Sequence, residues 1–224
     1  MNSAAQTNTV IEDYVKTIYH HTEWQSDPIT PSVLATRLGL AASSVTEMVK
    51  KLSASGLVSH VPYGAITLTD AGRALALTMV RRHRLIETWL VESFGYTWDE
   101  VHDEAEVLEH ALSDRLLGRI AEQLGQPVRD PHGDPIPSAD GRILIPDAVV
   151  LADAEPGHRG AIVRISDRDP ELLRYLVEHG VVLDAAVEVV GPKPFGGALE
   201  VRIAERILDL GADAASAIWV SRRA

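Results

Sequence analysis

Residues 30–68 read TPSVLATRLGLAASSVTEMVKKLSASGLVSHVPYGAITL, and their helix and turn signals indicate the architecture of the N-terminal part. Thr30 followed by Pro31 predicts a helix start, because a capping side chain and a proline both suit the first helical turn. Gly39 is typical of a helix end. After a short turn, apolar residues at three-and-four spacing predict a second helix, which Gly56 ends.

Two further signals accompany the second helix. Ser44 with Glu47 fits a capping box, although Ser43 could be the cap instead. Residues 58–61 and 65–68 flank a Pro-Tyr-Gly turn, which predicts a β-hairpin. The order helix, short turn, helix and hairpin is typical of a winged helix-turn-helix.

Other helices are predicted on both sides of this motif. Residues 8–20 carry apolar side chains at helical spacing, and Thr69 with Asp70 caps a long helix. A second capping box opens a predicted helix over residues 98–124.

The composition changes after this last helix. Residues 127–146 contain five prolines and two glycines, which predicts a linker. Beyond it, short β-rich runs surround one helix at about residues 170–179, as in a small barrel. We therefore expect a mainly α chain with a β-rich C-terminal domain.

The chain has 224 residues and a net charge of −11, which is unusual for a protein that binds DNA. The acidity is unevenly spread. Residues 1–80 hold 5 basic and 6 acidic side chains, whereas residues 81–224 hold 16 and 26. An acidic remainder weakens non-specific phosphate binding, and a bound divalent cation would offset part of it.

The sequence contains no cysteine, which excludes disulfides and thiolate metal sites and fits a cytoplasmic protein. It has no run of eighteen apolar residues, and its first nine residues lack an export signal. We therefore expect a cytoplasmic protein without a membrane partner.

A cluster of acids and histidines begins at Asp99 and ends at His110. On a helix, His102, Glu106, Glu109 and His110 would share an arc of ~100°. Carboxylates on one face repel one another unless a cation neutralises them, which is the physical case for a metal. A solvated acidic face is the other interpretation, and the local pattern leaves both open.

His83 and Glu87 share a face of the preceding helix, although such a pair can simply decorate a surface. Two antiparallel helices with such faces could form a bundle-type metal site. Oxygen and imidazole donors without sulfur favour Mn²⁺ or Fe²⁺, while Zn²⁺ could still bind tightly in vitro.

Four segments carry a family resemblance: EDY at 12–14, RRHRLIE at 81–87, VHDEAEVLEH at 101–110 and DPHGDPIP at 130–137. With the helix-turn-helix, they resemble the diphtheria toxin repressor (DtxR) family, most of all the manganese transport regulators (MntR) of actinobacteria. The resemblance implies three domains. They are a winged helix-turn-helix DNA-binding domain at 1–75, a helical metal-binding and dimerisation domain with a Pro/Gly-rich linker at 76–145, and an SH3-like (FeoA-like) domain at 146–224.

The resemblance also implies two sets of metal ligands. The primary set combines one residue of the first helix with three of the later stripe: Asp13, Glu106, Glu109 and His110. The ancillary set is His83, Glu87 and His102, to which the C-terminal domain could add Asp167.

The iron-responsive branch has Met and Cys where this chain has Asp13 and Glu106. Replacement of soft sulfur by carboxylate favours manganese, with iron as the alternative. We expect that Zn²⁺, Co²⁺ or Cd²⁺ could bind in vitro. Lys16 stands where two-domain manganese regulators have Glu, which argues against their paired binuclear site.

The expected DNA contacts lie near the N-terminal half of the second helix of the motif and at the wing tip: Ser43, Ser44, Thr46, Glu47, Lys50, Lys51 and Tyr63. Hydroxyls suit phosphates and base edges, and Glu47 could accept from a cytosine amino group. Each of these residues, taken singly, could instead be a cap or face solvent.

We therefore expect a metal-dependent repressor of manganese homeostasis genes that binds operator DNA as a homodimer. The apolar residues Val107, Leu108, Ala111 and Leu112 could form the dimer contact or ordinary core. An enzyme is not expected, because hydrolase and phosphate-loop motifs are absent from the sequence. The rival class is a winged-helix regulator that responds to an organic ligand. That class would give the His/Glu stripe no function, so we expect no organic ligand.

Overall fold

The computed structural model describes residues 3–61 and 64–222. The chain divides into two compact units, one of Met1–Arg82 with Pro137–Arg142 and the other of His83–Ile136 with Ile143–Ala224. One apolar core cluster lies in the first unit, and two lie in the second, one in its helical part and one in its β-rich part. Among the described residues, no helix has an apolar stretch long enough to cross a membrane.

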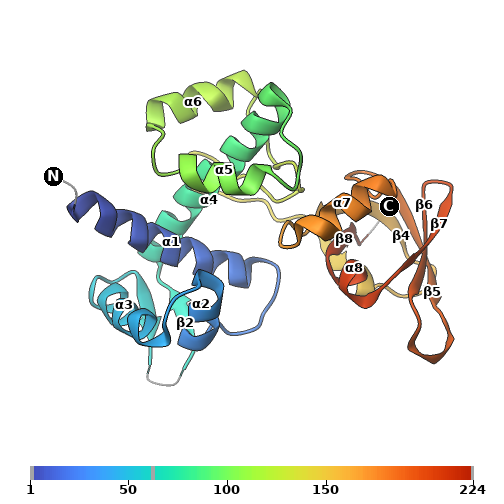
Figure 1. The fold of residues 1–224 in the computed structure, drawn as a ribbon, viewed down its shortest axis with the longest axis horizontal. Helices are drawn as coiled ribbons and strands as arrows, with labels where there is room; N and C mark the ends of the chain where they lie inside the picture. Colours follow the sequence, from blue (N-terminus) through green and yellow to red (C-terminus); the bar gives the residue numbers. More distant parts are fainter. Residues whose placement is uncertain (1–2, 62–63, 223–224) are drawn as a thin grey trace. The chain divides into compact units, whose positions relative to one another are not determined.

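The first unit holds the predicted winged helix-turn-helix (Figure 1). Its elements are α1 (Ser3–Glu23), α2 (Pro31–Leu38), α3 (Ala42–Ala54), β1 (Val58–His60) and β2 (Ile66–Leu68). The two strands pair antiparallel, with Ser59 opposite Thr67. One core joins these elements and includes Ile18, Leu34 and Val49. Burial of this apolar surface is the main force that holds the unit together.

The ends of α2 follow the sequence signals. The Thr30 hydroxyl accepts a hydrogen bond from the N–H of Val33 (3.4 Å), and Pro31 occupies the first turn. Gly39 ends the helix in the left-handed region at φ 64°, where a side chain would be strained.

The capping box predicted for Ser44 and Glu47 is wrong. Helix α3 begins earlier, at Ala42, and the residue in the cap position, Ala41, makes no side-chain cap hydrogen bond. The Thr46 hydroxyl instead donates to the carbonyl of Ala42 (2.8 Å). Ser43 and Ser44 therefore lie within the first turn, with exposed side chains.

Helix α4 (Asp70–Phe94) leads into the second unit, where α5 (Val101–Leu108) and α6 (Asp114–Gln123) follow. The single helix predicted over residues 98–124 is wrong. Ser113 accepts a hydrogen bond from the N–H of Leu116 (3.3 Å) and caps α6. A short polar side chain that bonds to its own backbone competes with a continuous helix, which explains the break.

The sequence does not decide whether residues 107, 108, 111 and 112 belong to the core or to a dimer contact, and the structure gives them different surroundings. Leu108 and Leu112 pack against the core cluster of the helical part. Ala111 is exposed, and the side chain of Val107 is 71% exposed. The intrachain interpretation therefore holds for the two leucines.

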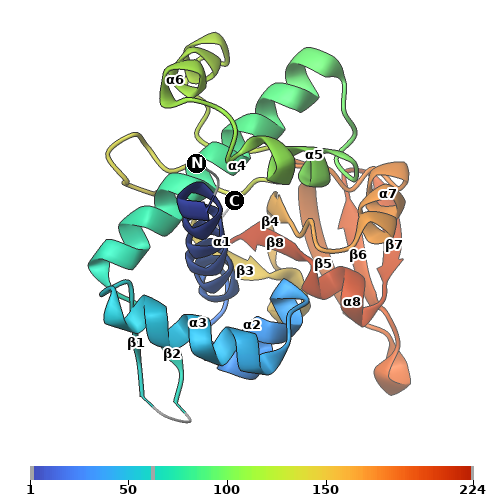
Figure 2. The ribbon, with the colours of Figure 1, turned by 60° about the vertical axis from the view of Figure 1, so that its left-hand side comes forward.

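The C-terminal part of the second unit is a small antiparallel β-domain (Figure 2). Its described strands are ordered β3-β8-β4-β5-β6-β7. Their bounds are β3 (Ala148–Val150), β4 (Arg159–Ile165), β5 (Ala186–Pro192), β6 (Leu199–Ile203), β7 (Arg206–Leu210) and β8 (Ile218–Ser221). Helices α7 (Pro170–Glu178) and α8 (Ala212–Ser216) lie beside the sheet. Strands β3 and β7 and helix α8 were not predicted.

The central part of the Pro- and Gly-rich linker is packed, since residues 132–137 are buried, whereas residues 138–146 are mostly exposed. The Oδ1 atom of Asp130 accepts hydrogen bonds from the backbone N–H groups of His132 and Asp134, each at 2.9 Å. Gly133 has φ 93°, and a Cβ there would lie 2.1 Å from a carbonyl oxygen of β4. The linker therefore needs glycine at this close approach.

Burial, together with the charges of Asp134 and Glu87, raises the pKa of the Asp130 carboxyl to about 8 from an ordinary 3.8. The folded chain therefore keeps this carboxyl protonated up to about pH 8, whereas the unfolded chain ionises it near pH 4. The stability that the protonated group contributes is complete below pH ~4 and is lost as pH rises to about 8.

Asp130→Asn keeps the Oδ1 acceptor and removes this ionisation. In chelator-treated protein, we expect the variant to exceed the parent in unfolding free energy by about 5 kcal/mol at pH ~8, with no gain near pH ~4, because the shift spans about 4 pH units at about 1.4 kcal/mol each. Denaturant unfolding across this range measures the effect, with the exposed Asp153→Asn as control. A gain that does not grow with pH would contradict the assignment.

Candidate metal centre

Helix α4 carries buried polar side chains in the second unit. These are 4% exposed or less: His83, Arg84, Glu87 and Thr88. Burial of a charge is costly unless neighbouring groups compensate it. Arg84 donates to the carbonyl of Pro135 (2.7 Å) and Thr88 to the carbonyl of Arg84 (2.7 Å). His83 and Glu87 find their partners elsewhere.

The imidazole of His83 lies among carboxylates. Its Nδ1 is 2.6 Å from Oε2 of Glu109, and its Nε2 is 3.0 Å from Oε1 of Glu87. The same Nε2 is 3.3 Å from Nδ1 of His102. The predicted i,i+4 pair on α4 is therefore a buried contact rather than a surface decoration.

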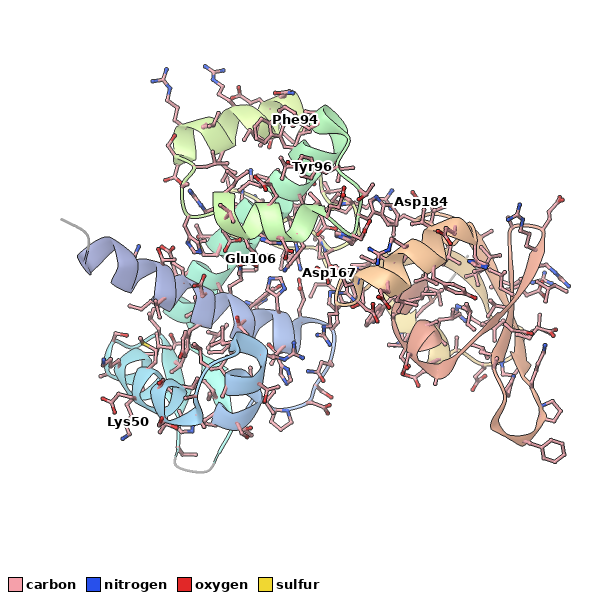
Figure 3. The ribbon with its side chains drawn as sticks, viewed as in Figure 1. Lys50, Phe94, Tyr96, Glu106, Asp167 and Asp184 are labelled. Atoms are coloured by element: carbon pink, nitrogen blue, oxygen red, sulfur yellow. The ribbon has the colours of Figure 1, made fainter. Side chains whose placement is uncertain are left out.

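Helix α5 brings two residues of the stripe to this pair. His102 Nε2 lies 3.7 Å from Oε1 of Glu106, and its Nδ1 lies 3.5 Å from Oε1 of Glu87. His83, His102 and Glu106 each offer a ligand atom within 4.8 Å of the others. Figure 3 shows Glu106 on α5. The structure thus joins Glu106, expected in the primary set, to two residues of the ancillary set.

Sequence reasoning did not select His132, which the linker contributes. Its side chain is fully buried. The Nε2 atom lies 3.0 Å from the carbonyl oxygen of Trp98, whereas Nδ1 has no hydrogen-bond partner. If Nε2 carries the proton and donates it to that carbonyl, Nδ1 has a free lone pair, as second-shell partners of metal-bound histidines arrange. A histidine between two aspartates in a Gly/Pro segment was the available signal.

Glu87, His132 and Asp167 form a second group whose ligand atoms lie within 4.8 Å of one another. Asp167 lies in the loop between β4 and α7 (Figure 3). Its Oδ2 is 3.7 Å from Nδ1 of His102. The C-terminal domain thus places a carboxylate beside the helical residues.

The charges of this group depend on one another. Burial alone would raise the pKa of Glu87, but the charge of His83 and hydrogen bonds from His102 and His83 hold it well below its ordinary range. The hydrogen bond to Glu87 raises the pKa of His102. Burial opposes a charge on His132, but the charges of Glu87 and Asp167 raise its pKa overall, and Asp130 adds to this where it is ionised. Carboxylates here favour positive charge on their neighbours.

A divalent cation fits this donor set. It offers carboxylate oxygens and imidazole nitrogens, the ligands of Mn²⁺, Fe²⁺ and Zn²⁺. The buried Nδ1 of His132 lacks a hydrogen-bond partner, which is unusual because buried polar atoms generally have one. A bound cation would satisfy that atom.

The remaining residues of the predicted primary set lie in different units. Asp13 belongs to α1 in the first unit, and Glu109 and His110 follow α5 in the second. Glu109 is fully buried, and its Oε1 lies 3.3 Å from Nε2 of His110. The joining of Asp13 to these two residues stays a prediction.

The expected DNA contacts on α3 that the structure describes are all exposed: Ser43, Ser44, Thr46, Glu47, Lys50 and Lys51. Glu47 and Lys50 approach to 3.8 Å, so part of the charge of Lys50 is shared within the helix. Thr46 and Lys50 also line a groove of about 960 Å³ with Thr30 and Ser32 of the α2 start. Tyr63 lies outside the described residues.

Three family models match almost the whole chain. Residues 6–66 match the iron dependent repressor N-terminal DNA binding domain. Residues 69–138 match the iron dependent repressor metal binding and dimerisation domain, and residues 149–222 match the FeoA domain. The predicted three-part fold, with an SH3-like C-terminal domain, is confirmed.

Relatives with similar architecture cover most of the chain. The iron-dependent repressor IdeR of Mycobacterium leprae is 32% identical, with 84% of this chain and 86% of that protein covered. The diphtheria toxin repressor of Corynebacterium glutamicum is 34% identical, with 80% and 79% covered. A solved structure of a manganese-dependent transcriptional repressor in complex with manganese has TM-score 0.91 and 51% identity, with 95% and 99% covered.

Both the matched domains and the relatives are those of DNA-binding repressors rather than enzymes. Members of this family bind operator DNA through the N-terminal domain and dimerise through the metal-binding domain. The chain belongs to the diphtheria toxin repressor family of metal-dependent transcriptional repressors.

Proposed function

We propose that this protein is a manganese-activated repressor that binds double-stranded operator DNA as a homodimer and controls manganese homeostasis genes. Such a regulator acts in the cytoplasm. The observation that carries the metal part is the convergence of Glu87, His132 and Asp167 from three separate segments. An iron-dependent repressor of the same family is the alternative.

The donor chemistry supports manganese over iron. The described clusters contain carboxylates and imidazoles, and the chain has no cysteine to offer a soft thiolate. A manganese-dependent repressor is similar over nearly the whole chain at 51% identity. The relatives named as iron-dependent, at 32% identity, keep iron as the alternative. Zinc, cobalt or cadmium could occupy the same donors in vitro.

In this proposal, Glu87, His132 and Asp167 would hold one ion, with His83 and His102 of the predicted ancillary set as its further ligands. The predicted primary set holds a second ion: Asp13, Glu106, Glu109 and His110. A bound cation supplies positive charge that neutralises carboxylates packed at short distance. The positions of the ligands supply the selectivity for one conformation, because ligands from separate segments meet only in one arrangement of those segments.

The switch is a shift of population toward that arrangement. In a dimer, it would set the two α3 helices to enter successive major grooves, ~34 Å apart. The ion can shift the equilibrium only by binding the DNA-competent state more tightly than the other.

The exposed apolar residues of the helical part support a homodimer. Phe94, labelled in Figure 3, is 62% exposed, Val107 is 71% exposed and Leu116 is 43% exposed. Large apolar side chains at the surface are candidates for a protein contact. We propose that they contribute to the dimer interface.

Operator binding by chelator-treated protein should be weak and should be switched on by Mn²⁺. Fluorescence anisotropy with labelled operator DNA at fixed salt measures this, with Fe²⁺ (anaerobic) and Zn²⁺ titrated in parallel. Equal activation by Fe²⁺ at the same concentration would favour the iron alternative. Operator binding of equal strength without metal would contradict the switch.

His132→Gln should lower the affinity for Mn²⁺ by about tenfold or more, because it replaces an imidazole ligand by an amide. Competition with a metal-binding dye measures this loss. His158→Gln is the matched control, since its Nε2 contacts the carbonyl of Ser221 (2.9 Å) within the β-domain. Unchanged affinity in His132→Gln would remove His132 from the ligand set.

Lys50→Ala should weaken binding to operator and non-operator DNA alike, because the lysine is expected to neutralise a phosphate. The slope of log affinity against log salt should fall by about 1. Lys193→Ala, a change at an exposed lysine of the β-domain, is the control. A selective loss of operator binding with an unchanged slope would instead assign Lys50 to base contact.

A further inference from the structure

A chain of buried charges lies beside the proposed ligands. Asp134 Oδ1 accepts a hydrogen bond from Nε of Arg164 (2.7 Å) and lies 3.4 Å from Nη2 of Arg84. All three residues are 6% exposed or less. The guanidinium of Arg164 also lies over the ring of Trp219, 4.2 Å from its centroid.

Each member comes from a segment that also carries a proposed ligand. Arg84 lies three residues before Glu87 on α4. Asp134 lies two residues after His132 in the linker. Arg164 lies on β4, three residues before Asp167. These charged side chains therefore connect the three segments at positions two or three residues from the proposed ligands.

Backbone contacts reinforce the same junction. The N–H of Ile165 donates to the carbonyl of His132 (2.9 Å), and Nη1 of Arg84 donates to the carbonyl of Pro135 (2.7 Å). A guanidinium offers a planar fork of donors, so its ion pairs fix direction as well as distance. Buried ion pairs often add little to the free energy of unfolding. They can instead select one particular arrangement of the segments that they join.

We propose that Arg84, Asp134 and Arg164 are positioning residues that set the separations of Glu87, His132 and Asp167 before the metal arrives. This inference rests on the proposed function. A site held in its binding geometry loses less conformational freedom when the ion binds, and so binds it more tightly.

Arg164→Gln tests the proposal, because it removes the charge that ties β4 to the linker. Arg159→Gln is the matched control: it also lies on β4 but is exposed and pairs with Glu188 (2.8 Å). The first measurement is hydrogen exchange at the Ile165 amide in chelator-treated protein. We expect exchange about tenfold faster or more in Arg164→Gln and unchanged exchange in Arg159→Gln.

The second measurement is Mn²⁺ affinity in a double-mutant cycle with Asp167→Asn. Arg164→Gln should lower the affinity about tenfold in the parent and cause little further loss once Asp167 is replaced, since it acts through that ligand. Equal losses in both backgrounds would overturn positioning, as would parent-like exchange and affinity.

Circular dichroism confirms that each variant folds, and Arg164→Lys serves if Arg164→Gln does not. Lysine keeps the charge but lacks the planar fork, so we expect intermediate exchange and affinity. Parent-like values for Arg164→Lys would overturn the geometric role. Failure of the parent to bind Mn²⁺ would overturn the proposed function, whereas the exchange result tests the docking of β4 independently.

Discussion

The buried carboxylate of Glu87 on α4 determines how the helices of the second unit pack. Glu87 is 1% exposed and could not remain ionised there without compensation. His83, one turn before it, and His102 of α5 supply that compensation at 3.0 and 3.5 Å. The helices must therefore pack so that their histidines meet this acid, which fixes the stripe of α5 against α4.

The same constraint explains why a Pro/Gly-rich segment is buried. His132 and Asp130 add one imidazole and one further acid to the neighbourhood of Glu87, and Arg84 answers with positive charge. The linker therefore contributes charged side chains to the buried cluster of the helical part, in addition to connecting two domains. Part of the acidity beyond residue 80, which is unusual for a DNA-binding protein, is concentrated at the proposed cation site.

Local chemistry made much of this predictable from the sequence. Thr30, Pro31 and Gly39 mark α2 because each acts within one helical turn, and the spacing of His83 and Glu87 places them on one face. Non-local effects escaped. The break between α5 and α6 depends on Ser113, which caps α6, although the pattern of apolar residues is also compatible with one continuous helix. The two aspartates that flank His132 in the linker were a signal, but only the fold shows that residue 132 lies beside residue 87. The short strands β3 and β7 are likewise defined by their partners rather than by their own pattern.

The distribution of donors along the chain bears on how such a site can act as a switch. A pair four residues apart on one helix, such as His83 and Glu87, keeps its geometry wherever the helix goes, so it cannot distinguish two conformations. Donors that lie 45 and 80 residues from Glu87, as His132 and Asp167 do, come together only when the linker and the β-domain are docked. In the proposed function, metal binding adds to the preference for the docked state that Arg84, Asp134 and Arg164 already give, by the difference between the affinities of the two states for the ion. Ligands from outside the helical stripe therefore make metal binding at the proposed site depend on the docked conformation. A site formed by the stripe alone would bind metal equally well in both conformations.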